Sequence, residues 1–284
     1  MVVNDFGGST AGEGGDQSPA EQVVSEIKKM GGDAVANYGN VASMNDGESM
    51  VKQALDTWGR LDILVNNAGI LRDKMVFNMT EDEWDSVIAV HLKGHFTVTK
   101  HAAMVMRQQR SGRIVSTSSE SGLGNMGQTN YGAAKEGIVG LTRSLALDMG
   151  RYGVTANAIR PRAATRLTIS PEMEAARARR QTAQAAGTAA KEDSSAQEAI
   201  SGIDAMRPEL VAPLVVFLCT DKAANINGRD FLVGGNEISL MSIPQRERTI
   251  FHEGGFTLDI LDRIFATTLG SGVTNPQPPQ VAKG

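Results

Sequence analysis

The feature that most constrains the fold is an alternation of short β-branched segments with longer segments of helical periodicity. Strands are predicted at Met1–Asn4, Ala34–Tyr38, Leu61–Asn66, Arg113–Thr117, Val154–Ile159 and Asp230–Val233. Helices are predicted at Pro19–Met30, at Asp46–Trp58, from Thr80 onward, at Tyr131–Met149 and at Pro208–Leu218. The strands are almost continuously apolar, as expected of parallel strands that helices cover on both faces. The pattern therefore predicts an α/β fold with a Rossmann-like, doubly wound parallel sheet.

The composition excludes several classes of protein. A single cysteine, Cys219, cannot form a disulfide framework, and a net charge of −4 argues against a nucleic-acid or acidic-membrane binder. No apolar run approaches the roughly 18 residues needed to span a membrane, and the N-terminus lacks the basic and apolar regions of a signal peptide. We expect one cytoplasmic domain over 1–284, with a lid-like insertion at 170–206 and a C-terminal extension at 240–284.

Tyr131 and Lys135 stand four residues apart in a predicted helix, which places them on the same helix face. A nearby positive charge favours the phenolate, so Lys135 is predicted to lower the pKa of the Tyr131 phenol. A phenol of lowered pKa can exchange a proton with an alcohol or a carbonyl group near neutral pH. The same spacing also occurs in ordinary exposed pairs, so the surrounding motifs decide its meaning.

Four motifs follow one another in the chain: N-N-A-G at 66–69, S-S-x-S-G at 118–122, Y-x-x-x-K at 131–135 and N-A-I-x-P at 157–161. With these motifs the chain resembles the short-chain dehydrogenase/reductases over nearly its whole length. G-N-M-G-Q-T-N-Y at 124–131 and R-P-E-L-V-A-P-L-V-V-F-L-C at 207–219 carry a narrower resemblance. They are similar to the (3R)-hydroxyacyl-CoA dehydrogenase part of peroxisomal multifunctional enzyme type 2 and its bacterial relatives.

The resemblance implies interconversion of a ketone and a secondary alcohol with a nicotinamide cofactor. Tyr131 would be the general acid/base, and Lys135 would lower its pKa and bind the nicotinamide ribose. Both Tyr131 and Lys135 would also contact the cofactor. Ser119 would hold the substrate oxygen if the motif is aligned from the strand, whereas counting back from Tyr131 gives Ser118. His91 occupies a position that is usually asparagine, where it would hold a relay water or simply pack within the helix. No metal site is expected, because His91 and His95 lack the H-E-x-x-H pattern.

The resemblance also implies the residues that contact the cofactor. Asp5 ends the first predicted strand, where a carboxylate accepts hydrogen bonds from the adenosine ribose and repels a 2′-phosphate, which favours NAD over NADP. An aspartate at this point could equally cap a turn. The remaining contacts are implied for the adenine, the adenosine ribose and the nicotinamide amide. They are Asn40, Val41, Asn67, Ala68, Gly69, Pro161, Ala163 and Thr165.

One expected motif is missing from the sequence, the glycine-rich turn T-G-x-x-x-G-x-G that holds the cofactor pyrophosphate in this family. The glycine-rich segment at 6–15 has a different spacing and follows what would be the family's second strand. We therefore expect that the opening βα unit is absent and that Met1 is not the biological start. Since the family's first strand is central, its loss would leave two strand edges unpaired in the middle of the sheet.

Several functions remain open on the sequence. The favoured one is oxidation of a (3R)-3-hydroxyacyl-CoA, or of a similarly bulky alcohol, by NAD. Within the same chemistry the alternatives are a 3-oxoacyl-(acyl carrier protein) reductase and a hydroxysteroid dehydrogenase. A non-catalytic remnant that has lost its cofactor site is the alternative from another class. The family resemblance further implies a homodimer or homotetramer.

Overall fold

The computed structural model describes residues 1–165 and 206–277. The chain divides into two compact units, Met1–Met241 and Ser242–Gly284, and each is described by itself. Except for Met206, the predicted insertion at 170–206 lies outside the described residues. The first unit carries every predicted site residue.

The strands of the first unit lie close to their predicted positions. They are β1 (Val2–Asn4), β2 (Val35–Asn37), β3 (Ile63–Asn66), β4 (Gly112–Thr117), β5 (Val154–Pro161), β6 (Asp230–Gly234) and β7 (Glu237–Leu240). Neighbours pair in parallel from β3 through β6, which agrees with the predicted α/β fold. β7 was not predicted and runs antiparallel to β6. The two residues between them, Gly235 and Asn236, are a typical hairpin turn pair and could have revealed this strand.

The sheet is divided where the missing strand was expected. β1 and β2 form a two-stranded sheet, whereas β3 to β7 form a separate five-stranded sheet in the order β3-β4-β5-β6-β7. Within 1–165 and 206–277, β1 and β3 therefore each pair with one strand, as predicted. On β3 the side chains of Ile63 and Val65 are 46% and 44% exposed, which is unusual for an apolar strand of a parallel sheet.

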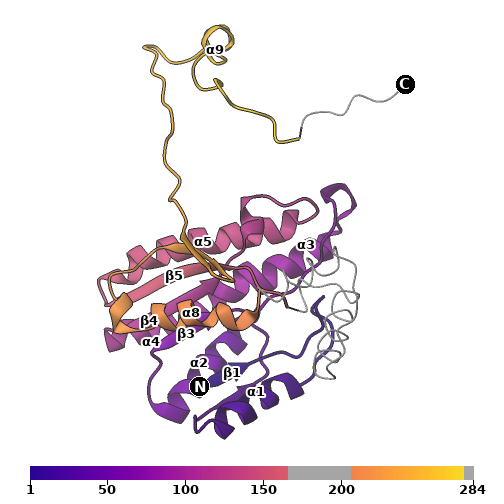
Figure 1. The fold of residues 1–284 in the computed structure, drawn as a ribbon, viewed down its shortest axis with the longest axis vertical. Helices are drawn as coiled ribbons and strands as arrows, with labels where there is room; N and C mark the ends of the chain where they lie inside the picture. The colour runs from indigo at the N-terminus through magenta and orange to yellow at the C-terminus, as the bar shows by residue number, and fades with distance from the viewer. Residues whose placement is uncertain (166–205, 278–284) are drawn as a thin grey trace, which may run out of the picture. The chain divides into compact units, whose positions relative to one another are not determined.

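The helices of the first unit alternate with its strands as predicted. Figure 1 shows α1 and α2 together with β1 on one side of this unit. They are α1 (Ser18–Lys29), α2 (Met44–Trp58), α3 (Glu81–Ile88), α4 (Gly94–Gln109), α5 (Thr129–Gly150) and α8 (Ala212–Leu218). Short 3₁₀ turns lie at Val76–Asn78, Glu120–Leu123, Pro208–Leu210 and Asp221–Ala223. The second unit contains α9 (Leu258–Ile264), which Thr257 caps.

The long helix predicted from Thr80 is interrupted. Thr80 and Glu83 form the expected reciprocal cap at the start of α3. A π-helical turn at Ala89–Lys93 then separates α3 from α4, and it contains His91. Single π turns inside helices often mark functional sites, and helical periodicity alone could not reveal this one.

Two apolar clusters cover opposite faces of the five-stranded sheet. One joins α2, α4 and α5 to the sheet, with Met50, Met106, Ile114 and Val154 at its centre. The other packs α8 against the opposite face through Leu214 and Leu218. Helices on both faces bury β4 and most of β5. This packing makes the carboxyl ends of β4 and β5 a rigid platform for the side chains that follow them.

Candidate active site

Tyr131, Ser119 and Lys135 lie together beyond the end of β4. Tyr131 is in the first turn of α5, and its phenol forms a hydrogen bond with the side chain of Ser119. The Lys135 ammonium lies 5.4 Å from the centre of the Tyr131 ring. It is buried and donates a hydrogen bond of 2.7 Å to the Thr117 carbonyl. The three predicted side chains are thus brought together by one strand end and one helix.

The two candidate serines have different environments. The hydroxyl of Ser118 is buried and donates to the Lys135 carbonyl at 2.8 Å. Ser119 is partly exposed, and its hydroxyl accepts from the Ser121 amide at 3.2 Å while also meeting the Tyr131 phenol. Because the Ser118 hydroxyl is committed to the main chain of α5, the geometry favours Ser119 as the serine that can meet a ligand.

The lowering of the Tyr131 pKa by Lys135 stays a prediction, because other groups set the direction of the shift in this structure. Burial raises the pKa of the Tyr131 phenol above its ordinary value, and the Asp73 charge raises it further, while the bond to Ser119 lowers it. Burial also lowers the pKa of Lys135 to about 7. The ammonium is therefore only partly charged at neutral pH, which weakens its attraction for a phenolate. The sequence spacing places the two groups together but carries no information about their burial.

His91 lies between Tyr131 and the N-N-A-G motif. Its ring meets the Tyr131 ring edge to face, with 5.1 Å between centres. Its Nε2 atom lies 3.1 Å from the Ile70 amide nitrogen and 2.8 Å from the Ile70 carbonyl oxygen, so the tautomer decides which bond forms. A Cβ on Gly69 would lie 2.4 Å from the ring, so only glycine fits there. His91 therefore packs against the motif as well as against the tyrosine.

The His91 side chain leaves one polar atom without a partner. Nδ1 is buried and has no hydrogen-bond partner among the described residues. Burial, followed by the Lys135 charge, lowers the pKa of His91 to about 3, and the same causes lower the pKa of His95 to about 3. Within 1–165 and 206–277, no three His, Cys, Asp or Glu side chains are grouped to hold a metal. Both predicted roles of His91 thus stay open, because the ring packs tightly and yet keeps a free acceptor or donor.

The first group of predicted cofactor residues lies in the half that contains β1. Asp5 follows β1, and its Oδ1 accepts from the Gly7 amide at 2.7 Å, which is the turn-capping bond foreseen as an alternative. Asn40 likewise accepts from the Ala42 amide at 2.9 Å. The Val41 carbonyl accepts a hydrogen bond from Thr97. These contacts order the loops and do not test a role in cofactor binding.

The second group lies at the ends of β3 and β5. Asn67 accepts from the Thr117 hydroxyl at 2.9 Å, and Ala68 beside it is exposed. Pro161 ends β5, while Ala163 and Thr165 follow it near the boundary of the described residues. Asn67 and Pro161 follow parallel strands and therefore lie at the same edge of the sheet, where α/β proteins bind ligands.

The sequence did not single out Asn130 or Arg72, which hold Tyr131 in place. The Asn130 side chain is fully buried and donates to the Arg72 carbonyl at 3.0 Å and the Glu83 carbonyl at 2.9 Å. Its Oδ1 accepts from the Tyr131 amide at 2.7 Å. The only signal was an asparagine beside a helix start, where it is a preferred residue.

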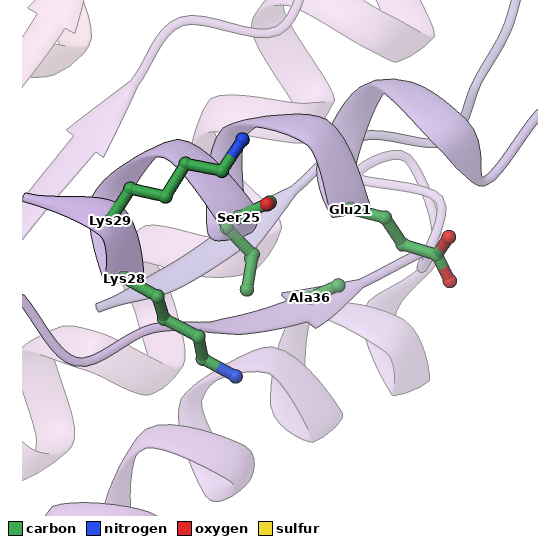
Figure 2. A pocket seen from close by; sticks show the side chains of 6 residues that line it. Glu21, Ser25, Lys28, Lys29 and Ala36 are labelled. Carbon is green, nitrogen blue, oxygen red and sulfur yellow. The ribbon is translucent and has the colours of Figure 1, made fainter.

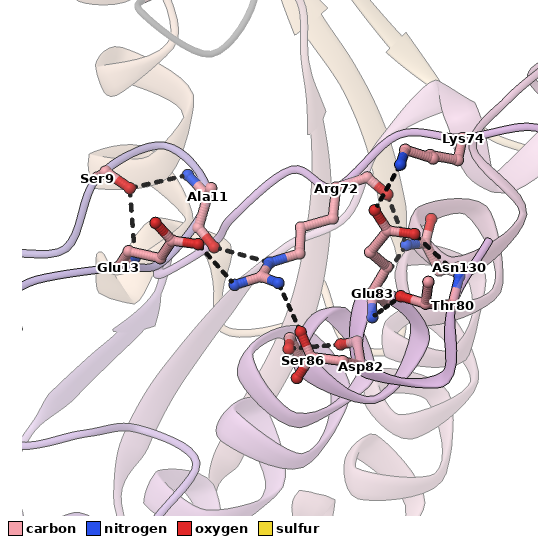
Figure 3. A network of polar contacts seen from close by, with 10 residues as sticks. All are labelled: Ser9, Ala11, Glu13, Arg72, Lys74, Thr80, Asp82, Glu83, Ser86 and Asn130. Carbon is pink, nitrogen blue, oxygen red and sulfur yellow. Dashed lines mark hydrogen bonds and ion pairs between the residues drawn. The ribbon is translucent and has the colours of Figure 1, made fainter. Parts of the chain in front are cut away.

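Arg72 extends this network to the glycine-rich segment (Figure 3). Its guanidinium donates to the Ala11 carbonyl at 3.0 Å and to Asp82 at 2.7 Å. It also lies 3.6 Å from a carboxylate oxygen of Glu13. The glycine-rich segment at 6–15 is therefore tied to the loop that follows N-N-A-G.

A pocket of about 460 Å³ lies between α1 and β2 (Figure 2). Glu21, Lys28 and Lys29 line it, together with Ser25 and Ala36. None of the predicted site residues contributes to it. Ser119, Tyr131 and Lys135 lie beyond the end of β4 instead.

The geometry can now be compared with known proteins. A family model described as short chain dehydrogenase matches residues 9–175, more than half of the chain. The chain belongs to the short-chain dehydrogenase/reductase family. It is therefore an oxidoreductase of a family that generally uses NAD(P).

The relatives refine this assignment. Hydroxyacyl-CoA dehydrogenase ChsB1 of Mycobacterium tuberculosis is 42% identical over 89% of this chain and 75% of its own length. Peroxisomal multifunctional enzyme type 2 of Mus musculus is 41% identical over 88% of this chain but only 30% of its own length. The narrower resemblance predicted from the sequence is thus confirmed as similarity. The chain spans less than a third of the mouse enzyme.

Solved structures agree with the fold. A short chain dehydrogenase from Mycobacterium avium superposes with a TM-score of 0.76 at 40% identity, covering 95% of this chain and 85% of that one. Across the described part of this chain, no helix is both long and apolar enough to cross a membrane. The predicted fold class is therefore confirmed.

Proposed function

We propose that this oxidoreductase interconverts a secondary alcohol and a ketone with NAD, and that its substrate is a (3R)-3-hydroxyacyl-CoA or a similarly bulky molecule. The hydrogen bond between the Tyr131 phenol and the Ser119 hydroxyl, beside the buried Lys135 ammonium, carries this proposal. A phenol and a hydroxyl that already share one hydrogen bond can both turn toward a single substrate oxygen.

Tyr131 exchanges the proton in the proposed mechanism. Because burial raises the pKa of the phenol, Tyr131 is protonated at neutral pH and can donate to the oxygen of a ketone as it is reduced. In the oxidative direction the phenolate accepts the hydroxyl proton of the alcohol. The Ser119 hydroxyl donates a second hydrogen bond to the same oxygen and so stabilises the charge that develops there.

The residues around Lys135 fit the ribose of a nicotinamide cofactor. An ammonium has three donors, and Lys135 uses one of them on the Thr117 carbonyl. The buried amine can thus donate to ribose hydroxyls at the edge formed by the ends of β3 and β4. When bound, the nicotinamide ring accepts or returns the hydride of the substrate carbon.

Asp5 supports NAD over NADP. Its carboxylate lies at the end of β1 and uses Oδ1 for the Gly7 amide. The second oxygen remains available to accept from a ribose hydroxyl, whereas a 2′-phosphate would meet a like charge. The turn-capping bond is compatible with this role because a carboxylate has two oxygens.

The substrate class rests on the relatives. The mycobacterial relative is named a hydroxyacyl-CoA dehydrogenase, and the mouse relative is a peroxisomal multifunctional enzyme. A 3-oxoacyl-[acyl-carrier-protein] reductase of Synechocystis is 37% identical over 86% of its own length, which supports that reductase as an alternative. A hydroxysteroid dehydrogenase remains a further alternative.

The divided sheet favours a second class of function for the chain as it stands, a protein that does not bind its cofactor. Among the described residues, β1 and β3 belong to separate sheets with no strand paired between them. The described residues thus contain no T-G-x-x-x-G-x-G turn of the kind that holds the cofactor pyrophosphate in this family.

Titration with NADH separates the two classes. The chain and a version extended at its N-terminus by a strand and a T-G-x-x-x-G-x-G turn are each titrated by fluorescence. We expect tight binding only by the extended version. Equal tight binding by both would refute the account of the missing unit, and binding by neither would refute NAD dependence.

The substrate is tested on the version that binds NADH. A panel of (3R)-hydroxyacyl-CoA thioesters, acyl carrier protein thioesters and hydroxysteroids is assayed for NADH formation. The highest kcat/KM is expected with the CoA thioesters. A preference for acyl carrier protein thioesters or for steroids would replace this substrate with the corresponding alternative. Homo-oligomerisation and a cytoplasmic location stay predictions, and light scattering tests the first.

A further inference from the structure

Arg160 is a buried charge outside the predicted site. It lies on β5 and is 1% exposed. Its three guanidinium nitrogens donate to three different elements. Nε donates to Asp230 on β6, Nη1 to the carbonyl of Ser119, and Nη2 to Glu136 on α5, each at 2.7 Å.

The free-energy cost of burying Arg160 calls for an explanation other than stability. Removing a guanidinium from water is unfavourable unless its partners compensate, and well-packed apolar residues often replace buried ion pairs without loss of stability. Asp230 is itself 4% exposed, and its Oδ1 has no hydrogen-bond partner among the described residues. Stability alone is therefore a weak reason for this buried pair.

The carbonyl that Arg160 holds belongs to Ser119, at the point where β4 leaves the sheet. The bond from the Ser118 amide to the Ile159 carbonyl, at 2.7 Å, lies just beyond the paired residues of β4 and β5. One residue further on, Arg160 supplies the donor that a strand neighbour would otherwise supply. The guanidinium thus continues the sheet by one hydrogen bond.

The same guanidinium fixes the helix that carries the tyrosine. Glu136 follows Lys135 directly in α5, so its bond to Arg160 ties α5 to β5. The turn after Ser119 rests on this ion pair. A Cβ on Gly122 would lie 2.7 Å from a Glu136 carboxylate oxygen and 3.1 Å from Nη1 of Arg160. The main chain of Ser119 and the helix that carries Tyr131 are therefore both bonded to the planar guanidinium of Arg160.

We propose that Arg160 is a positioning residue that holds the Ser119 main chain in register with α5, so that the serine hydroxyl and the Tyr131 phenol reach the same substrate oxygen. This inference rests on the proposed function. It predicts that Arg160 acts through Ser119 and not on the cofactor.

A double-mutant cycle tests the proposal. R160K keeps the charge but replaces the planar fork by a compact ammonium, which cannot reach three acceptors on separate segments at once, and R113K is the matched control. Arg113 is a buried arginine at the other end of β4, bonded to Gly112, Gly153 and Asp221. In the NADH-binding version, R160K is expected to lower kcat about 10- to 100-fold without changing the NADH dissociation constant. Added to S119A, it is expected to lower kcat less than about 2-fold further, since contacting residues are not additive.

Hydrogen–deuterium exchange supplies a readout that does not need turnover. R160K should speed exchange of the amides at 118–124, whereas R113K should leave them unchanged. If R160K does not fold, E136Q takes its place, since the Glu136 side chain is 39% exposed and its loss perturbs the fold less. Smaller changes in the same directions are expected for E136Q.

Two results would overturn the proposal. One is an equal fall in kcat whether Ser119 is present or replaced in S119A, and the other is unchanged exchange at 118–124. Failure of the proposed function looks different, because S119A and Y131F would then leave turnover unaffected. In that case the exchange of 118–124 alone decides whether Arg160 anchors the strand end.

Discussion

The two sheets of the first unit differ in how completely they are built. In the five-stranded sheet, every residue of β4 is buried, and helices cover both faces. In the two-stranded sheet, by contrast, all residues of β1 and β2 are only partly buried. The exposed side chains of Ile63 and Val65 lie on β3, the edge strand of the five-stranded sheet.

This difference separates the candidate catalytic residues from one group of the predicted cofactor residues. Ser119, Tyr131 and Lys135 all belong to the well-packed half, at the end of β4 and on α5. Asp5, Asn40 and Val41 belong to the other half. The candidate catalytic residues therefore lie in the more completely buried part of the first unit.

The largest expected effect comes from removing the phenol in the well-packed half. Y131F should lower kcat by about 10²- to 10⁴-fold in the NADH-binding version, because the proton donor is lost. NADH affinity should stay within about 2-fold, since the variant keeps the ring. Wild-type turnover by this variant would refute the proposed catalytic role of Tyr131.

A pair of serine variants sharpens the same point. S119A should lower kcat by about 10²-fold, as expected for the loss of one hydrogen-bond donor to a charged oxygen. S118A removes the bond to the Lys135 carbonyl and should act mainly on stability, by about 1 kcal/mol. Steady-state kinetics and thermal unfolding distinguish the two. Exchanged effects would assign the catalytic role to Ser118.

Two valines that face each other in the sheet compare the halves directly. Val65 on β3 pairs with Val115 on β4, but Val65 is 44% exposed and Val115 only 1%. V115T buries a hydroxyl and should destabilise by about 1–3 kcal/mol. V65T should stay within about 0.5 kcal/mol. Urea unfolding measures both, and an equal cost for V65T would mean that β3 is covered in solution.

The smallest expected effect is on the pH dependence of stability, through the buried side chain of His91. The pKa of His91 is lowered to about 3, while the unfolded chain protonates its histidines near pH 6.5. Between these values the unfolded state binds more protons, so this histidine makes the folded state less stable as the pH falls. H91N should reduce that slope by up to about 1.4 kcal/mol per pH unit.

Unfolding free energies measured in urea from pH 7 to pH 4 check this slope. The double variant H91N/H95N should reduce it further, because burial lowers the pKa of His95 in the same way. A slope that is unchanged in H91N would show that His91 accepts a proton in the folded state and that its surroundings are wet.

The sequence was sufficient for the parts of the structure that periodicity and strong motifs encode. The parallel strands, the cap at Thr80 and the approach of Tyr131 to Lys135 all follow from local spacing. The division of the sheet followed from a missing motif combined with a known strand order. Such features need only neighbours in the chain or a family pattern.

The remaining features depend on burial and on contacts between distant residues. Spacing could not show that burial lowers the pKa of Lys135 to about 7, nor that burial raises the pKa of Tyr131. Nor could it show that Arg160 meets Ser119, Glu136 and Asp230, which lie 41, 24 and 70 positions away. The π turn at Ala89–Lys93 likewise interrupts a segment whose apolar residues keep helical spacing.

Arg72 joins the two halves of the first unit through hydrogen bonds on both sides. Its side chain holds the Ala11 carbonyl, while its own carbonyl holds Asn130, whose Oδ1 accepts from the amide of Tyr131. A molecule that draws the glycine-rich segment toward itself would therefore pull, through one arginine, on the first turn of α5. The position of Tyr131 is thereby coupled to the glycine-rich segment that follows β1.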